Sequence, residues 1–260
     1  EGTGANKDVK RIIRRFSSQS VLPACINSSG NHIGYSEVIE KRPDGSFIRS
    51  KYTNFDNGHM DEAPEAIIFP NRTPYGPYAS RSVERGKLLC EELYSAGGIL
   101  QSSKHLTYER SSDLYVRSMK TSLDYICPTS FITYADGCSY KVYLYDYRLK
   151  SEKDTLYDNP SFPISTQTDY EYDPDGLIKV ISESANGGIR KQTYKRIRES
   201  SSDIYTQMVQ KHILSPIVEK KEYFISEDGT SCQLKQVKYE YVPIKGVSDH
   251  FFPCYSCLLY

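Results

Sequence analysis

Residues 169–196, DYEYDPDGLIKVISESANGGIRKQTYKR, decide the fold class because they place two turn signals between β-prone runs. Asp175-Gly176 separates the first pair of runs, and Gly187-Gly188 separates the second pair. Asp and Gly both tolerate the positive φ angles of a type I′ turn, so Asp-Gly between two such runs predicts a β-hairpin. This stretch therefore predicts consecutive antiparallel strands.

The same plan recurs elsewhere in the chain, each time as a turn pair flanked by β-prone runs. The copies are 34–53 with Asp44-Gly45, 86–109 with Gly97-Gly98, 217–241 with Asp228-Gly229, and a weaker one around Asp136-Gly137. Recurrence of one supersecondary unit indicates a repeat-built fold. We therefore predict a mainly β protein, an antiparallel sheet of repeated β-hairpins with one or two short helices.

The amino-acid composition is consistent with a β-sheet protein and argues against two classes of binding partner. The chain of 260 residues has 23 Tyr, 9 Phe and no Trp, and Tyr suits half-wetted sheet surfaces. Basic and acidic residues both number 33, which argues against nucleic acid and against an anionic membrane surface as partners. No apolar run reaches the ~18 residues that a membrane span needs, so none is expected.

Three segments depart from the hairpin plan. Val9, Ile12, Ile13 and Phe16 have helical spacing but also suit a strand, within an N-terminal segment at 1–25. A helix is predicted at 204–214, with Asp203 as its cap, Pro216 as its stop and His212 on its packed stripe. The stretch 55–82 is rich in Pro, Asn and Gly and reads as a long loop within a single domain at 26–260.

The hairpin units resemble the YD-repeat (Rhs-like) proteins of Bacteroidetes-type bacteria. The closest copy of that repeat is Tyr172-Asp173-Pro174-Asp175-Gly176-Leu177, and the order of 34–62, the central Tyr-rich strands and 203–223 adds to the likeness. In that family the units stack into an extended, twisted sheet. The group is commonly exported or attached to the outer surface as lipoproteins, so the resemblance implies an extracellular or outer-surface location.

Two candidate ligand sites follow from residue type. Asn54, Asp56, Asn57, Asp61 and Glu62 form the densest group of oxygen ligands, so Asp56, Asp61 and Glu62 are candidates for holding a hard cation such as calcium, against solvated loop carboxylates as the alternative. Tyr143, Tyr145 and Tyr147 share one face of a predicted strand. They are candidates for stacking a sugar ring, against cross-strand pairs that only stabilise the sheet.

Cysteine and histidine add no recognisable motif. The seven cysteines are an odd number and are interpreted mainly as small buried residues; they are Cys25, Cys90, Cys127, Cys138, Cys232, Cys254 and Cys257. Cys254 and Cys257 have redox and zinc spacing but lack the further ligands or the βαβ context, which favours two thiols or a local disulfide. Any Cys/His pairing would have to be made by the fold.

The absence of a catalytic motif leaves three functional hypotheses. We expect first a non-enzymatic surface or secreted scaffold, without a cofactor, that binds protein or glycan and associates through unpaired sheet edges. The alternative is a carbohydrate-binding or carbohydrate-processing protein, whose catalytic mark would be two carboxylates in one cleft. The third is the repeat portion of an Rhs-type toxin.

Overall fold

The computed structural model describes residues 34–68, 77–127, 132–158, 162–185, 187–243 and 251–259. The predictions for 1–25 and for Val9 to Phe16 lie outside these residues. The described chain is mainly β, which confirms the predicted fold class. Its elements are β1 (Glu37–Lys41), β2 (Phe47–Tyr52), β3 (Glu65–Ile68), β4 (Leu88–Tyr94), β5 (Leu100–Arg110), β6 (Tyr115–Cys127), β7 (Ile132–Tyr143), β8 (Tyr147–Leu156), β9 (Ile164–Tyr172), β10 (Ile178–Ala185), β11 (Gly188–Arg196), α1 (Asp203–Gln210), β12 (Ile217–Ser226), β13 (Ser231–Pro243) and β14 (Phe251–Leu259), with 3-10 helices at Phe55–Asn57, Ser82–Glu84 and Ile197–Glu199.

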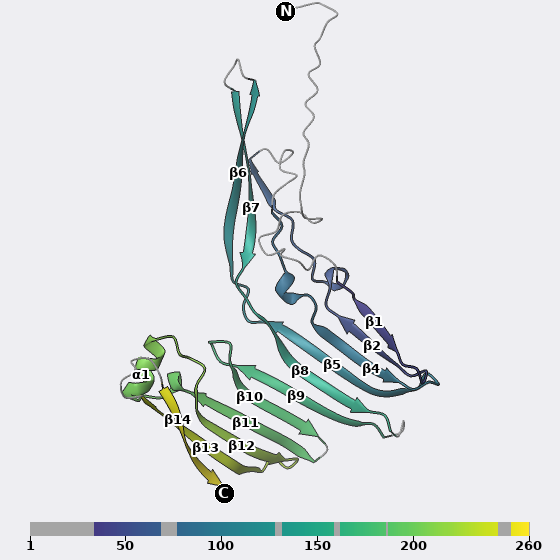
Figure 1. The fold of residues 1–260 in the computed structure, drawn as a ribbon, viewed down its shortest axis with the longest axis vertical. Helices are drawn as coiled ribbons and strands as arrows, with labels where there is room; N and C mark the ends of the chain where they lie inside the picture. Colours follow the sequence, from purple (N-terminus) through teal and green to yellow (C-terminus); the bar gives the residue numbers. More distant parts are fainter. Residues whose placement is uncertain are drawn as a thin grey trace, which may run out of the picture. The chain divides into compact units, whose positions relative to one another are not determined.

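Eleven strands form one antiparallel sheet in the order β1-β2-β4-β5-β8-β9-β10-β11-β12-β13-β14 (Figure 1). Apart from β3, β6 and β7, each strand pairs with the next one along the chain, so the sheet is a meander. Such an order follows from short hairpin connections, which favour pairing between neighbours in sequence. The strands at its two edges are β1 and β14.

The three remaining strands form a second sheet in the order β3-β7-β6. Where the sequence predicted a single domain, the contacts divide the chain into two compact units. The smaller unit holds the described residues within Asp61–Ser80 and Arg117–Val142, and the larger unit holds the meander. The described part of the smaller unit is thus supplied by two insertions, one in the β2–β4 connection and one in the β5–β8 connection.

Four hairpins of the large sheet close with the same turn. In each, the first residue donates its N–H to the carbonyl four residues later, and a glycine at the fourth position donates back to the first carbonyl. The four glycines are Gly45, Gly98, Gly176 and Gly229, with φ between 77 and 87°. These are three-residue loops that need one positive φ, so the hairpins are confirmed but the type I′ turn was wrong.

Two other turn predictions need correction. Asp136-Gly137 lies inside β7, where Gly137 faces a bulge between Ala66 and Ile68 of β3. A glycine suits a strand at a bulge because it leaves room for a close backbone. The β10–β11 connection is two residues long, with Ala185 paired to Gly188, so Gly188 already belongs to β11.

The predicted helix is confirmed but ends a turn early. α1 runs from Asp203 to Gln210 with Ser202, not Asp203, as its N-cap. The N–H groups of His212 and Ile213 donate to the carbonyls of Val209 and Met208, which is a Schellman motif with His212 in the left-handed region at φ 56°. His212 is therefore an exposed residue just beyond the C-terminal end of α1, and its predicted place on the packed stripe was wrong.

The described part of the segment 55–82 contains regular structure where a loop was predicted. A 3-10 helix lies at Phe55–Asn57, β3 pairs antiparallel with β7, and a second 3-10 helix begins at Ser82. The sequence hid this strand because only four residues, EAII, carry it. No described helix is both long enough and apolar enough to pass through a bilayer.

Two small clusters supply the most completely buried side chains of the large unit. One is apolar, where Met208 of α1, Ile197 of a 3-10 helix and Val218 of β12 pack together. The other surrounds Glu84, whose side chain has no exposed surface. The apolar cluster includes Met208, which the sequence predicted to lie on the packed face of the helix. The burial of a carboxylate was not predicted by any sequence pattern.

Candidate functional site

The Glu84 centre consists of Glu84, His59, Arg110 and Tyr145, all in the larger unit. The 3-10 helix Ser82–Glu84 turns the carboxylate inward, where Oε2 lies 2.6 Å from His59 Nδ1 and Oε1 lies 2.8 Å from Arg110 Nε. The Tyr145 hydroxyl donates to the same Oε1. Three donors from three other parts of the chain therefore hold one buried carboxylate.

The electrostatics of this centre follow from burial and hydrogen bonding together. Burial alone would raise the pKa of Glu84, but the hydrogen bonds from Arg110, Tyr145 and His59 outweigh it and leave the pKa below the ordinary value. Burial and the Glu84 carboxylate both raise the pKa of Tyr145. Glu84 is thus a paired anion, and Tyr145 keeps its proton and donates a hydrogen bond. This is the chemistry of a structural centre, and it is unsuited to a general base.

A second group lies on one face of the β4–β5 hairpin. Cys90 pairs directly with His105 across the two strands, and Glu92 lies two residues from Cys90 on the same face. Cys90 Sγ is 3.9 Å from His105 Nε2, and the ligand atoms of all three residues lie within 4.8 Å of one another. Cys90 is buried, Glu92 half-buried and His105 exposed, so the group is open to solvent on one side.

This Cys/His pair does not have the electronics of a nucleophile. Burial and the neighbouring Glu92 raise the pKa of the Cys90 thiol, which disfavours the reactive thiolate. In a catalytic triad the acidic residue orients the base, whereas Glu92 is bound by the thiol, by Arg49 and by Tyr94.

The sequence contained a signal for this pair that motif searching missed. Cys90 and His105 lie seven residues out from the predicted Gly97-Gly98 turn on either side, so a two-residue turn places them opposite each other. The observed loop is one residue longer, but a bulge between Leu93 and Tyr94 restores the same register. For the Glu84 centre no such signal exists, because its residues are not neighbours in a hairpin.

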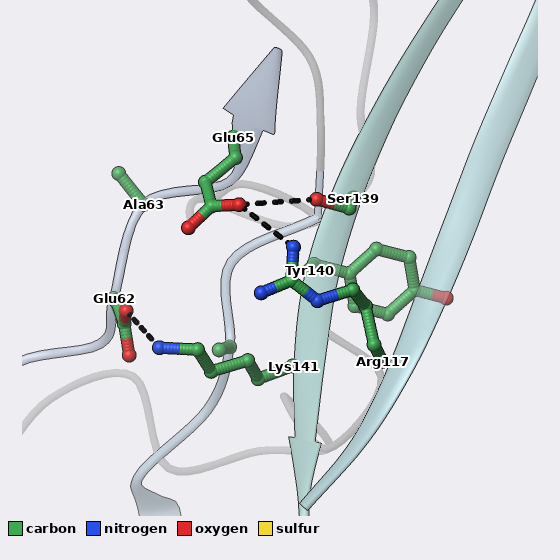
Figure 2. Close-up of a pocket in the computed structure, with 8 residues that line it drawn as sticks. Glu62, Ala63, Glu65, Arg117, Ser139, Tyr140 and Lys141 are labelled. Atoms are coloured by element: carbon green, nitrogen blue, oxygen red, sulfur yellow. Dashed lines mark hydrogen bonds and ion pairs between the residues drawn. The ribbon is translucent and has the colours of Figure 1, made fainter. Parts of the chain in front are cut away.

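In the smaller unit a shallow hollow is bounded by two ion pairs (Figure 2). Arg117 reaches Glu65 at 3.0 Å, and Lys141 reaches Glu62 at 2.6 Å. Ser139 also donates to Glu65 at 3.4 Å. Because each carboxylate faces a cation, the hollow has balanced charge and provides no strong electrostatic preference for a ligand.

The three predicted stacking tyrosines do not lie along one strand. β7 ends at Tyr143, β8 begins at Tyr147, and Tyr145 lies in the connection between them, so the predicted continuous strand was wrong. Tyr145 is only 6% exposed and points its hydroxyl at Glu84, while Tyr143 and Tyr147 are half-buried. The Tyr147 ring stacks on Tyr108 at 5.5 Å. Sugar stacking by these residues stays a prediction.

The predicted cation ligands are occupied with protein partners. Asp56 accepts a hydrogen bond from Ser36 at 2.6 Å in the larger unit, and Glu62 pairs with Lys141 in the smaller unit. Within the described residues, Asp56, Asp61 and Glu62 are not among three ligand atoms within 4.8 Å of one another. A calcium role for them stays a prediction.

Two of the three cysteines whose side chains are described follow the interpretation made from the sequence, and the third departs from it. Cys90 and Cys138 are free and buried, which confirms small buried thiols, and Cys232 is free and exposed. Cys254 and Cys257 lie on β14, and their side chains are outside the described part, as are those of Cys25 and Cys127.

The β1 edge is a second kind of candidate site, made of main-chain groups. All five side chains of β1 are exposed, and among the described strands only β2 pairs with it. The Tyr52 N–H donates to the main-chain carbonyl of Ser36, and the Arg42 N–H donates to the main-chain carbonyl of Ser46. Because antiparallel pairs alternate, Val38 and Glu40 turn their main-chain groups toward β2, whereas Glu37, Ile39 and Lys41 turn theirs outward.

No protein-family model matches this chain, and no curated protein matches it. The YD-repeat resemblance therefore stays a prediction.

Proposed function

We propose that this chain is a non-enzymatic scaffold that associates with a second copy of itself by pairing β1 edge to β1 edge. The observation that carries the proposal is the set of outward main-chain groups at Glu37, Ile39 and Lys41 on an exposed edge strand. An unpaired edge is a ready template for another strand, and its main-chain hydrogen bonds provide affinity.

The sequence of β1 is complementary to itself about Ile39. In an antiparallel pair centred on Ile39, Glu37 of one copy lies opposite Lys41 of the other, and the two Ile39 side chains meet. Opposite charges directly across a strand pair are favourable, and a self-complementary patch suits a two-fold symmetric dimer. The shift that places Ile39 opposite Lys41 is disfavoured, because it brings Glu40 of one copy opposite Glu40 of the other.

The resemblance to exported YD-repeat proteins supports placing this scaffold outside the cell or on its outer surface. In that setting, pairing of the β1 edges of two copies would join their sheets into one broader sheet. The toxin-portion and carbohydrate hypotheses remain as alternatives, without a described contact that favours either.

The test is the mass of the full chain in solution, measured by sedimentation equilibrium over a range of concentrations. The wild type should be a dimer at high concentration. Ile39→Pro should be a monomer, because proline removes an outward N–H that the dimer uses and β2 does not. Ile39→Ala is the matched control, since it keeps the N–H and should still dimerise with weaker affinity.

Charge exchange separates edge pairing from any other dimer. Glu37→Lys should weaken the dimer about fivefold or more by placing Lys opposite Lys41, and adding Lys41→Glu should restore it. A wild type that stays monomeric at high concentration contradicts the proposal. So does a dimer that Ile39→Pro leaves intact while circular dichroism shows an unchanged sheet.

A further inference from the structure

The group on the β4–β5 hairpin has a function that edge pairing does not use. We propose that Cys90, Glu92 and His105 bind one divalent transition-metal ion of the zinc type, with solvent as the fourth ligand. This site is independent of the proposed dimer, because its ligands lie on β4 and β5 and the edge strand is β1.

The spacing of the donor atoms is close to that of a tetrahedral centre. Bond lengths of about 2.3 Å to sulfur and about 2.0 Å to nitrogen place the two atoms roughly 3.6 Å apart around zinc. Cys90 Sγ and His105 Nε2 are 3.9 Å apart, so the pair needs to close by only a few tenths of an ångström. The widest separation in the group is within 4.8 Å, which side-chain rotation can close.

The backbone orients these ligands before any metal arrives. Cys90 and His105 are directly opposite in the hairpin register, and Cys90 and Glu92 alternate onto the same face of β4. Thiolate, imidazole and carboxylate together are ligands typical of zinc, and three protein ligands with one open position are typical of an accessible zinc site. The exposed side of His105 provides that opening.

Glu92 is held in place by partners that leave one oxygen available. Arg49 Nε donates to Oε2 at 2.7 Å, and the Tyr94 hydroxyl donates to the same Oε2 at 3.0 Å. These donors fix the carboxylate in the manner of the outer-shell partners that orient metal ligands. The Cys90 thiol also hydrogen-bonds to the Glu92 carboxylate, so the sulfur and the carboxylate already lie side by side. Arg49 also balances part of the charge of a bound thiolate and carboxylate.

The experiment is a titration of the reduced, chelator-treated full chain with Co²⁺, followed by competition with Zn²⁺. Wild type should show, for one equivalent, the intense visible bands of tetrahedral cobalt and a near-ultraviolet thiolate-to-cobalt charge-transfer band. Cys90→Ser should lose the charge-transfer band, and His105→Ala should weaken binding by roughly 100-fold or more, since even outer-shell changes cost about 10- to 100-fold.

Two controls separate this site from other thiols. Cys232→Ser removes an exposed free thiol and should leave both bands unchanged. The double variant Cys254→Ser, Cys257→Ser tests the competing Cys-x-x-Cys spacing and should also leave them unchanged. The proposal is overturned if the bands are absent in wild type, survive in both Cys90→Ser and His105→Ala, or disappear with Cys254 and Cys257. His105 is exposed, so its variant should fold even if a change at buried Cys90 disturbs the sheet.

Discussion

Two 3-10 helices of the larger unit each bury one side chain completely, and the two side chains are chemical opposites. Ser82–Glu84 buries the Glu84 carboxylate, and Ile197–Glu199 buries Ile197. Ile197 packs on Met208 and Val218, so its cluster is held by apolar contact. Glu84 is instead held by His59, Arg110 and Tyr145, through hydrogen bonds and charge.

The difference concerns what happens when one member is lost. An apolar cluster loses transfer free energy and gains a cavity, a graded penalty that neighbours can partly relax. A buried carboxylate that loses its cation cannot relax in this way, because the free-energy cost of removing it from water is no longer offset by the ion pair. The two clusters should therefore respond to substitution with different magnitudes and, above all, with different dependence on pH.

The largest effect is expected from Arg110→Met. It leaves the buried Glu84 without its cation and should lower the free energy of unfolding by about 3 kcal/mol or more, measured by urea denaturation. Lys150→Met is the control, because Lys150 and Glu109 form an exposed pair at 3.5 Å in the same unit, and such pairs contribute about 0 to 1 kcal/mol. Equal losses in the two variants would show that Glu84 does not need its cation.

The apolar cluster should give a smaller loss. Met208→Ala removes a side chain that is 1% exposed and should lower the free energy of unfolding by about 2 to 3 kcal/mol, as expected for truncation in a small core. Met208→Leu keeps the volume and should cost less than about 1.5 kcal/mol. A loss of similar size from both variants would mean that shape, not buried volume, holds this cluster.

Acid titration separates the two clusters most directly. Glu84 has a pKa below its ordinary value near 4.5, so it adds stability above that pH, and this stability is lost as pH falls through the lower, folded-state pKa. Glu84→Gln should flatten the acid side of a stability–pH curve measured by urea denaturation. Met208→Ala should lower the whole curve without changing its slope. Parallel curves for wild type and Glu84→Gln would contradict the assignment.

The sequence predicted the repeated hairpins because each turn carries its own signal. Asp44-Gly45, Asp175-Gly176 and Asp228-Gly229 lie at observed turns, since one left-handed glycine closes each loop. Asp136-Gly137 shows the limit of that signal. A glycine can mark a hairpin turn, but it can also lie inside a strand opposite a bulge, as Gly137 does. The helix was likewise predictable from its local apolar spacing.

The polar centres could not be predicted in the same way. His59, Glu84, Arg110 and Tyr145 come from different connections and strands, and no periodicity links them. Each looks like an ordinary surface residue until the meander brings them together. Cys90 and His105 are intermediate, because hairpin register pairs them but nothing in the letters marks the pair as ligands.

The smallest effect tests the end of the helix that closes the apolar cluster. His212 occupies the left-handed position of the Schellman motif at φ 56°, where a side chain is strained and glycine is favoured. His212→Gly should therefore raise the free energy of unfolding by about 0.5 to 1 kcal/mol in urea denaturation. His212→Ala keeps the strain and should change stability by less than about 0.5 kcal/mol. If alanine stabilised as much as glycine, the imidazole, not the backbone angle, would be the source of the cost.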